Sequence, residues 1–235
     1  KELNKLIELY DAGISYVDRM TGSLLRILER SNILEETFVV ITADHGQQFL
    51  EHGCYGHGVG YLYDELIHVP LIITGPGLEN KVVGQQVSLL DLAPTILDIL
   101  EIEKPRAFLG NSLLPLINET NAKVGNSEAI SETNVTGHPV GFGGGIKPLL
   151  DVNHRKISLR TGKWKYIYTE GEQDELYDLE DDPKETQNII GVEPEIAAEL
   201  RARIMAHIEL EDKSTPGEEE QIKAKIRKLK SGGKI

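Results

Sequence analysis

The sequence predicts an α/β protein in which a mixed sheet is flanked by helices, followed by a small antiparallel sheet packed by a helix. Three observations support this fold class. A helical apolar period runs from the first residue to about residue 30, and a β-branched strand pattern follows at 37–43. Strand patterns separated by turns then recur between 156 and 179. Helix followed by apolar strand is the alternation from which α/β sheets are built.

The first third of the chain contains the stretch around which we expect the rest to be organised. A strand over 37–43 delivers Asp44 and His45 at its carboxyl end, where ligands collect in open α/β sheets. A loop rich in His and Gly follows, and a second strand, expected to be buried, lies within 68–77.

The middle of the chain is less regular. The pattern predicts a short strand or edge at 81–87, a helix at 91–100, a loop at 104–116 and a strand at 128–132. Asp91 is the expected N-cap of the helix. Residues 133–154 are rich in Gly, Pro and Asn and predict a long irregular segment.

The last third alternates polar and apolar residues in three short strands, which predicts an antiparallel meander followed by a helix over 194–210. The expected organisation is an α/β part at 1–154, a small antiparallel subdomain at 155–212 and a charged tail at 213–235.

Composition excludes several classes of protein. A formal net charge of -13 argues against a general nucleic-acid binder, which needs an excess of Lys and Arg. Cys54 is the single cysteine, so the chain has no internal disulfide. No apolar run is long enough to span a bilayer. The helical pattern is already running at Lys1, and we therefore expect the chain to be cut from a longer protein.

Asp44 and His45 are candidate metal ligands. Adjacent residues on a regular strand point to opposite faces, so both reach one ion only if the chain turns, as Gly46 would permit. A carboxylate and an imidazole form a credible half of a metal site. The competing interpretation is a turn at the strand end with a hydrogen-bonded His.

His57 is the candidate catalytic residue. It lies between two glycines and could donate to an anionic oxygen or act as a general acid. The alternative is an ordinary His in a surface loop. His52, His68 and Asp18 are expected to be structural or solvated.

The order of the motifs resembles the C-terminal half of a sulfatase, a family of the alkaline-phosphatase-like superfamily of metal-dependent ester hydrolases. The similar segments are 41–46, 51–58, 62–65, 68–77, 87–97, 159–166 and 175–183. The resemblance implies that Asp44 and His45 bind a divalent metal, and that His57 contacts the anionic oxygens of the ester and assists the leaving group. Ca²⁺ is the first expectation for the metal, with Zn²⁺ or Mn²⁺ as alternatives.

The resemblance also implies a formylglycine nucleophile, made from Cys or Ser in the missing N-terminal half. Cys54 is followed by Tyr55-Gly56-His57 and does not match that motif. The expected function is therefore the C-terminal part of a sulfatase that hydrolyses sulfate esters of a small molecule or glycan. The fragment alone is expected to be inactive.

Two other functions stay open. Many sulfatases have Lys where this chain has His57, and His occurs there in phosphoryl-transferring relatives, which favours a phosphodiesterase or phosphoryl transferase acting on phosphate esters. A non-catalytic binding module would instead use the basic tail and the Gly-rich segment 141–145 as contacts.

Overall fold

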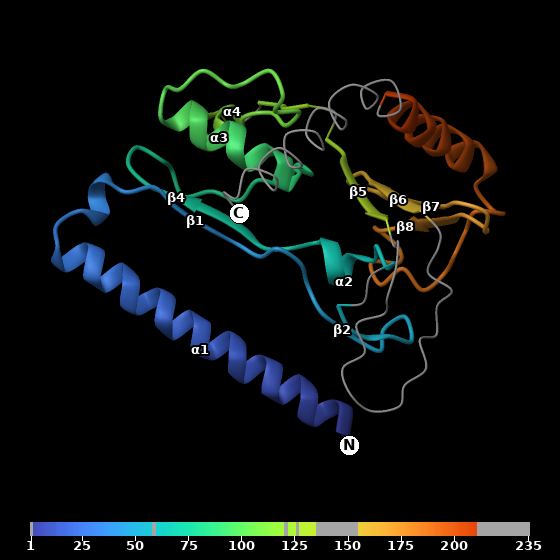
Figure 1. Cartoon of the computed structure of the whole chain (residues 1–235), viewed down its shortest axis with the longest axis horizontal. Helices are drawn as coiled ribbons and strands as arrows, with labels where there is room; N and C mark the ends of the chain where they lie inside the picture. Colours follow the sequence, from blue (N-terminus) through green and yellow to red (C-terminus); the bar gives the residue numbers. More distant parts are fainter. Residues whose placement is uncertain (1, 58–59, 120–121, 126, 135–154, 211–235) are drawn as a thin grey trace, which may run out of the picture.

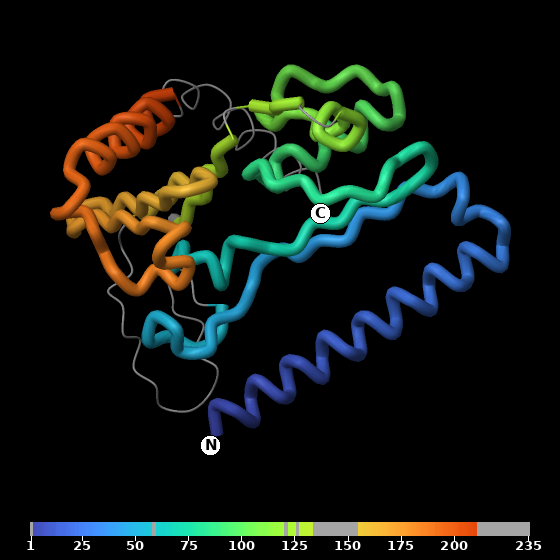
Figure 2. The backbone as a smooth tube through the Cα atoms, turned by 180° about the vertical axis from the view of Figure 1, so that it is seen from behind, coloured from blue at the N-terminus to red at the C-terminus, as the bar shows by residue number. Residues whose placement is uncertain are grey.

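The computed structural model describes residues 2–57, 60–119, 122–125, 127–134 and 155–210. The Gly-rich segment 141–145 and the charged tail lie outside these residues. A long helix, α1, and the helices α3 and α4 lie on opposite sides of a two-stranded ribbon of β1 and β4 (Figure 1). A four-stranded sheet and its helix form the far end of the molecule, as the reverse view also shows (Figure 2).

Helix α1 spans Glu2–Arg30, as the helical period predicts. Asn32 ends it with a φ of 55°, and the short 3-10 helix η1 follows at Leu34–Glu36. No residue of α1 is buried. The Tyr10 ring meets the edge of Phe49 at a centroid distance of 5.2 Å.

Strand β1 (Val39–Thr42) pairs antiparallel with β4 (Leu71–Thr74), which confirms both expected strands. The expected burial of the second strand, β4, is wrong for this chain: Ile72 is 55% exposed, and no residue of β1 or β4 is buried. The reason is that the described residues contribute only these two strands to the ribbon.

The expected strand at 81–87 is wrong, because this segment is irregular. Val82 is 98% exposed. The side-chain amide of Gln85 both donates to the Val124 carbonyl and accepts from the Val124 N–H. This side chain therefore makes the pair of bonds that a strand backbone would otherwise make.

The expected helix at 91–100 is confirmed as α3 (Leu92–Ile99), preceded by the 3-10 turn η2 (Leu89–Asp91). Asp91 is the N-cap residue of α3, as expected, but its side chain does not cap this helix. It instead forms a capping box with Ser88.

Four short elements were not expected from periodicity: β2 (Gln48–Phe49), β3 (Tyr55–Gly56), α2 (Asp64–Ile67) and α4 (Leu114–Asn118). β2 and β3 pair with each other and close the His- and Gly-rich loop into a small hairpin. The loop predicted at 104–116 ends in α4.

The four-stranded sheet contains the predicted antiparallel meander of β6 (Arg155–Arg160), β7 (Trp164–Thr169) and β8 (Glu175–Asp178). Its fourth strand, β5 (Ala129–Asn134), was predicted as a strand but not as part of this sheet, and it pairs antiparallel with β6. The helix over 194–210 packs on it. The buried core joins Ile157, Leu159, Tyr166 and Leu176 of the sheet to Ala197, Leu200 and Ile204 of the helix. The expected boundary between the α/β part and the antiparallel subdomain, after residue 154, falls between β5 and β6. These two strands pair over six residues of the same sheet.

No helix in the described part of the chain is both long and apolar enough to cross a membrane.

Candidate functional site

Asp44 and His45 follow the carboxyl end of β1, where the sequence places them. The Asp44 side chain is 90% exposed, and its Oδ1 accepts the His45 N–H at 2.9 Å. The His45 Nδ1 lies 2.9 Å from the carbonyl oxygen of Gly46, so Nδ1 carries the proton and donates. The lone pair of Nε2 is then free, 3.8 Å from Asp44 Oδ2.

His57 directly follows β3 of the β2–β3 hairpin, which places its side chain next to that of His45. Its ring stacks on that of His45, with centroids 4.7 Å apart and an interplanar angle of 28°. The His57 Nδ1 lies 3.2 Å from Gln47 Oε1, which favours the same tautomer, with Nε2 free. The three candidate site residues therefore lie together. Sequence reasoning missed Gln47, whose role depends on the hairpin.

Gly46 is expected to permit a turn of the chain, but the structure gives a different reason for a glycine at this position. Its φ is not positive. It is needed because the backbone packs closely: its N–H donates to the Leu66 carbonyl at 2.8 Å, and a Cβ would lie 2.0 Å from the Glu65 carbonyl oxygen. Gly46 thus joins the candidate site to α2.

The donor set fits part of a metal site. Asp44 Oδ2 and His45 Nε2 are two adjacent donors, and the Nδ1–H···O=C bond of His45 is the outer-shell support usual for a metal-binding imidazole. Among the described residues, no group of three or more His, Cys, Asp or Glu side chains could hold an ion. The described residues therefore offer two candidate ligands, Asp44 and His45.

His52 is structural, as expected, and central to the loop. Its ring stacks on Tyr63 at 3.6 Å, its Nδ1 lies 2.6 Å from Glu65 Oε1, and its Nε2 lies 3.0 Å from the Glu185 carbonyl oxygen. Burial lowers the pKa of His52, but the bonds to Glu65 and Glu185 outweigh burial and leave the pKa raised. Both nitrogens face acceptors, so both donate in the imidazolium form.

A buried ionic cluster beside α2 was missed from the sequence. Lys165 Nζ lies 2.8 Å from Asp64 Oδ1 and 2.8 Å from Glu185 Oε1, and Arg160 Nη2 lies 2.9 Å from Asp64 Oδ2. Burial raises the pKa of Asp64, but Arg160 and Lys165 outweigh it and hold the pKa below its ordinary value. Burial also raises the pKa of Glu185, and there it prevails over Lys165.

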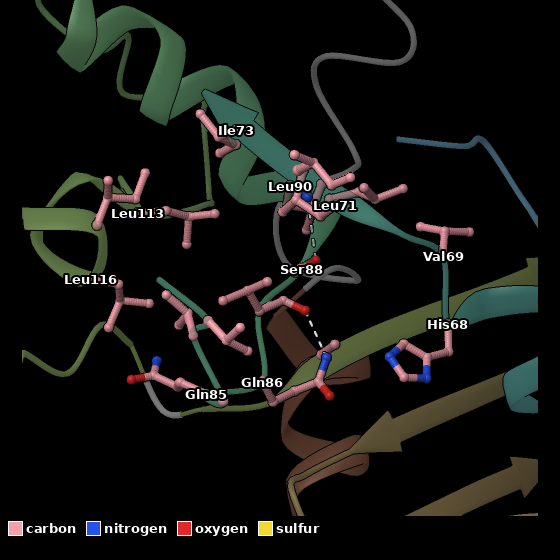
Figure 3. A pocket seen from close by; sticks show the side chains of 18 of the residues that line it. His68, Val69, Leu71, Ile73, Gln85, Gln86, Ser88, Leu90, Leu113 and Leu116 are labelled. Atoms are coloured by element: carbon pink, nitrogen blue, oxygen red, sulfur yellow. Dashed lines mark hydrogen bonds between the residues drawn. The ribbon is translucent and has the colours of Figure 1, made fainter. Parts of the chain in front are cut away.

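A cavity of about 1310 Å³ extends from the candidate site along β4. Asp44 and His45 are among the residues that line it. His68 lies at one side of the cavity, and Leu113 and Leu116 lie at the opposite side (Figure 3). The cavity is therefore continuous with the exposed faces of the candidate ligands.

The chain is similar in sequence and in fold to known proteins. Residues 2–102 match the family model described as Sulfatase. Arylsulfatase K of Rattus norvegicus is 35% identical over 211 residues, which cover 88% of this chain and 36% of that protein. BT1596, a 2-O GAG sulfatase, superposes with a TM-score of 0.69 at 30% identity and covers 82% of this chain and 40% of that chain.

The phosphonate monoester hydrolase SpPMH from Silicibacter pomeroyi superposes with a TM-score of 0.67 at 24% identity, over 81% of this chain and 38% of that chain. This likeness shows the fold alone.

The arrangement is thus that of an alkaline-phosphatase-like fold. Within that fold, the chain is similar to members of the sulfatase family. The chain spans little more than a third of the length of the curated relatives that it matches.

Proposed function

We propose that this chain is the C-terminal part of a metal-dependent sulfatase that hydrolyses sulfate esters of small molecules or glycans. The observation that carries the proposal is the cluster of Asp44, His45 and His57 at the carboxyl end of β1, with the Nε2 atoms of both imidazoles free. The similarity to sulfatases supports sulfate as the group transferred.

Asp44 and His45 would hold the divalent ion, together with ligands from the rest of the protein. Once bound, the ion supplies Lewis-acid polarisation of the ester oxygens. Ca²⁺ suits the carboxylate, whereas the imidazole of His45 suits Zn²⁺ or Mn²⁺. Formylglycine, the expected nucleophile, would come from the N-terminal half.

His57 acts on the ester. Gln47 accepts from Nδ1 and thereby directs the Nε2 of a protonated His57 away from the hairpin. In that state Nε2–H donates to an anionic oxygen as negative charge develops, which stabilises the transition state more than the ground state. His57 is then also placed to give this proton to the departing oxygen.

The test is turnover of an aryl sulfate and the matching aryl phosphate by the full-length protein. His57→Ala should lower kcat for the sulfate by about 100- to 1,000-fold, and Asp44→Ala should lower both the metal content and the rate. His207→Gln is the matched control, because His207 lies on the helix over 194–210 and not in the cluster.

A clear preference for the phosphate would replace the proposal with phosphoester hydrolysis, which the imidazole pair of His45 and His57 also suits. If Asp44→Ala changed neither metal content nor hydrolysis, the chain would instead be a binding module.

A further inference from the structure

Helix α2 lies between the candidate site and the four-stranded sheet, and it is tied to both. On the sheet side, Asp64 accepts from Lys165 Nζ at 2.8 Å and from Arg160 Nε at 3.0 and 3.1 Å. These partners are far away in the sequence and lie on β6 and β7. The N-terminus of α2 is therefore fixed to the sheet by charge.

Lys165 is shared with a second carboxylate. Its side chain is fully buried, and its Nζ lies 2.8 Å from Glu185 Oε1, whose residue is 1% exposed. The other oxygen of Glu185 accepts the Asp64 N–H at 2.6 Å. Glu185 makes these contacts with a φ of 54°, a conformation that residues other than glycine rarely adopt. Lys165 thus connects β7, α2 and the turn after β8.

On the other side, α2 holds the loop that carries the candidate site. Gly46 donates its N–H to the Leu66 carbonyl at 2.8 Å. Glu65 Oε1 accepts from Gln48 Nε2 at 2.9 Å and lies 2.6 Å from His52 Nδ1. Gly46 directly follows His45, and Gln48 lies on the strand that pairs with Gly56, next to His57. A displacement of α2 would therefore displace both imidazoles.

We propose that Lys165 is a positioning residue of the site: with Asp64 and Glu185 it fixes α2, and α2 fixes the loop of His45 and His57. Its charge stays buried because two carboxylates compensate it, an arrangement that is costly to break from one side. Lys165 contacts none of the candidate site residues and acts through α2. The catalytic part of this proposal rests on the proposed function.

The test compares two methionine variants in the full-length protein. Lys165→Met removes the shared charge, whereas Arg155→Met removes the ion pair with Glu132 inside the same sheet, where Arg155 Nε lies 2.7 Å from Glu132 Oε1. Lys165→Met should speed amide hydrogen exchange in peptides spanning 44–57 by about tenfold or more. It should lower kcat by about tenfold or more with a smaller change in KM, because misplaced groups slow the chemical step. Arg155→Met should change neither.

The proposal would be overturned if amide hydrogen exchange in peptides spanning 44–57 were as slow in Lys165→Met as in the wild type. It would also be overturned if Arg155→Met sped this exchange as much as Lys165→Met does. If Lys165→Met does not fold, Lys165→Met/Glu185→Gln removes one charge of each sign and leaves Asp64 paired with Arg160. In that double variant, faster exchange at 44–57 supports the proposal, and native exchange refutes it.

The exchange measurement requires no substrate. If the wild-type protein hydrolyses no sulfate ester, the proposed function fails, and the exchange of 44–57 still decides whether Lys165 positions the loop.

Discussion

Replacing Gly46 with alanine should loosen the junction between the candidate site and α2. The added Cβ would lie 2.0 Å from the Glu65 carbonyl oxygen, 2.9 Å from its carbon and 3.3 Å from Leu66 Cα. All three are backbone atoms, so no side chain can rotate away, and the two segments must separate by about 1 Å. That movement also stretches the 2.8 Å bond from Gly46 N–H to the Leu66 carbonyl. Overpacking and the weakened bond together should cost about 2–4 kcal/mol.

Urea unfolding followed by the fluorescence of Trp164, the single tryptophan, measures this loss. Gly162→Ala is the matched control, because a Cβ there meets nothing within 4 Å and its φ is not positive. We expect the control to change the free energy of unfolding by less than about 0.5 kcal/mol. A Gly46→Ala variant as stable as the control would refute the close-packing explanation.

Three further predictions concern the core, the loop and the metal. Ile204→Ala, at a fully buried position, should cost about 2–5 kcal/mol in urea unfolding, against little for Val192→Ala at a position 72% exposed. His52→Phe keeps a ring over Tyr63 but removes the charge. The pKa of His52 is raised in the folded chain, so the protonated ring stabilises the folded state. This stabilisation is complete at pH values below the ordinary pKa of 6.5, and it is lost as the pH rises through the pKa of the folded state. The free energy of unfolding of the wild type, measured in urea, should therefore exceed that of the variant most at pH 5.5. A difference that does not change with pH would contradict this. Calorimetry on the 235-residue chain should find a dissociation constant for a divalent metal that is weaker than micromolar. The reason is that Asp44 and His45 would supply only two of the roughly four to eight ligands that an ion takes. Tighter binding would contradict the proposal that this chain carries only part of the metal site.

The sequence could predict those parts of the fold that depend on local periodicity. Helix α1 and the strands β6, β7 and β8 show clear periods of 3.6 and 2, and the structure places them where the pattern indicates. The four residues of α2 and the five of α4 are too few to show a helical period. The expected strand at 81–87 failed because Val82 and Val83 are exposed to solvent and do not pack against a neighbouring strand.

In the candidate site too, the features that depend on local pattern could be predicted, and those that depend on tertiary contacts could not. Asp44 and His45 could be proposed as site residues because a strand ends just before them. The contact between His45 and His57 depends on the hairpin of the short strands β2 and β3. Lys165 could not be recognised from local pattern. Polar–apolar alternation in β7 predicts a solvated face, yet Lys165, Tyr166 and Ile167 are all buried in succession because β7 is covered on both faces. Its partners, Asp64 and Glu185, lie 101 and 20 residues away.

The exposure of α1 has a consequence for how the 235-residue chain unfolds. The helix has 29 residues and is about 43 Å long, and it buries none of them. Its stability therefore owes little to the core of Ile157, Leu159 and Ile204. A helix with few tertiary contacts, here the ring pair of Tyr10 and Phe49, melts on its own. Circular dichroism should report a loss of helix at lower urea than the Trp164 signal of the sheet. The two curves would not coincide, so the chain should unfold in two cooperative units instead of one.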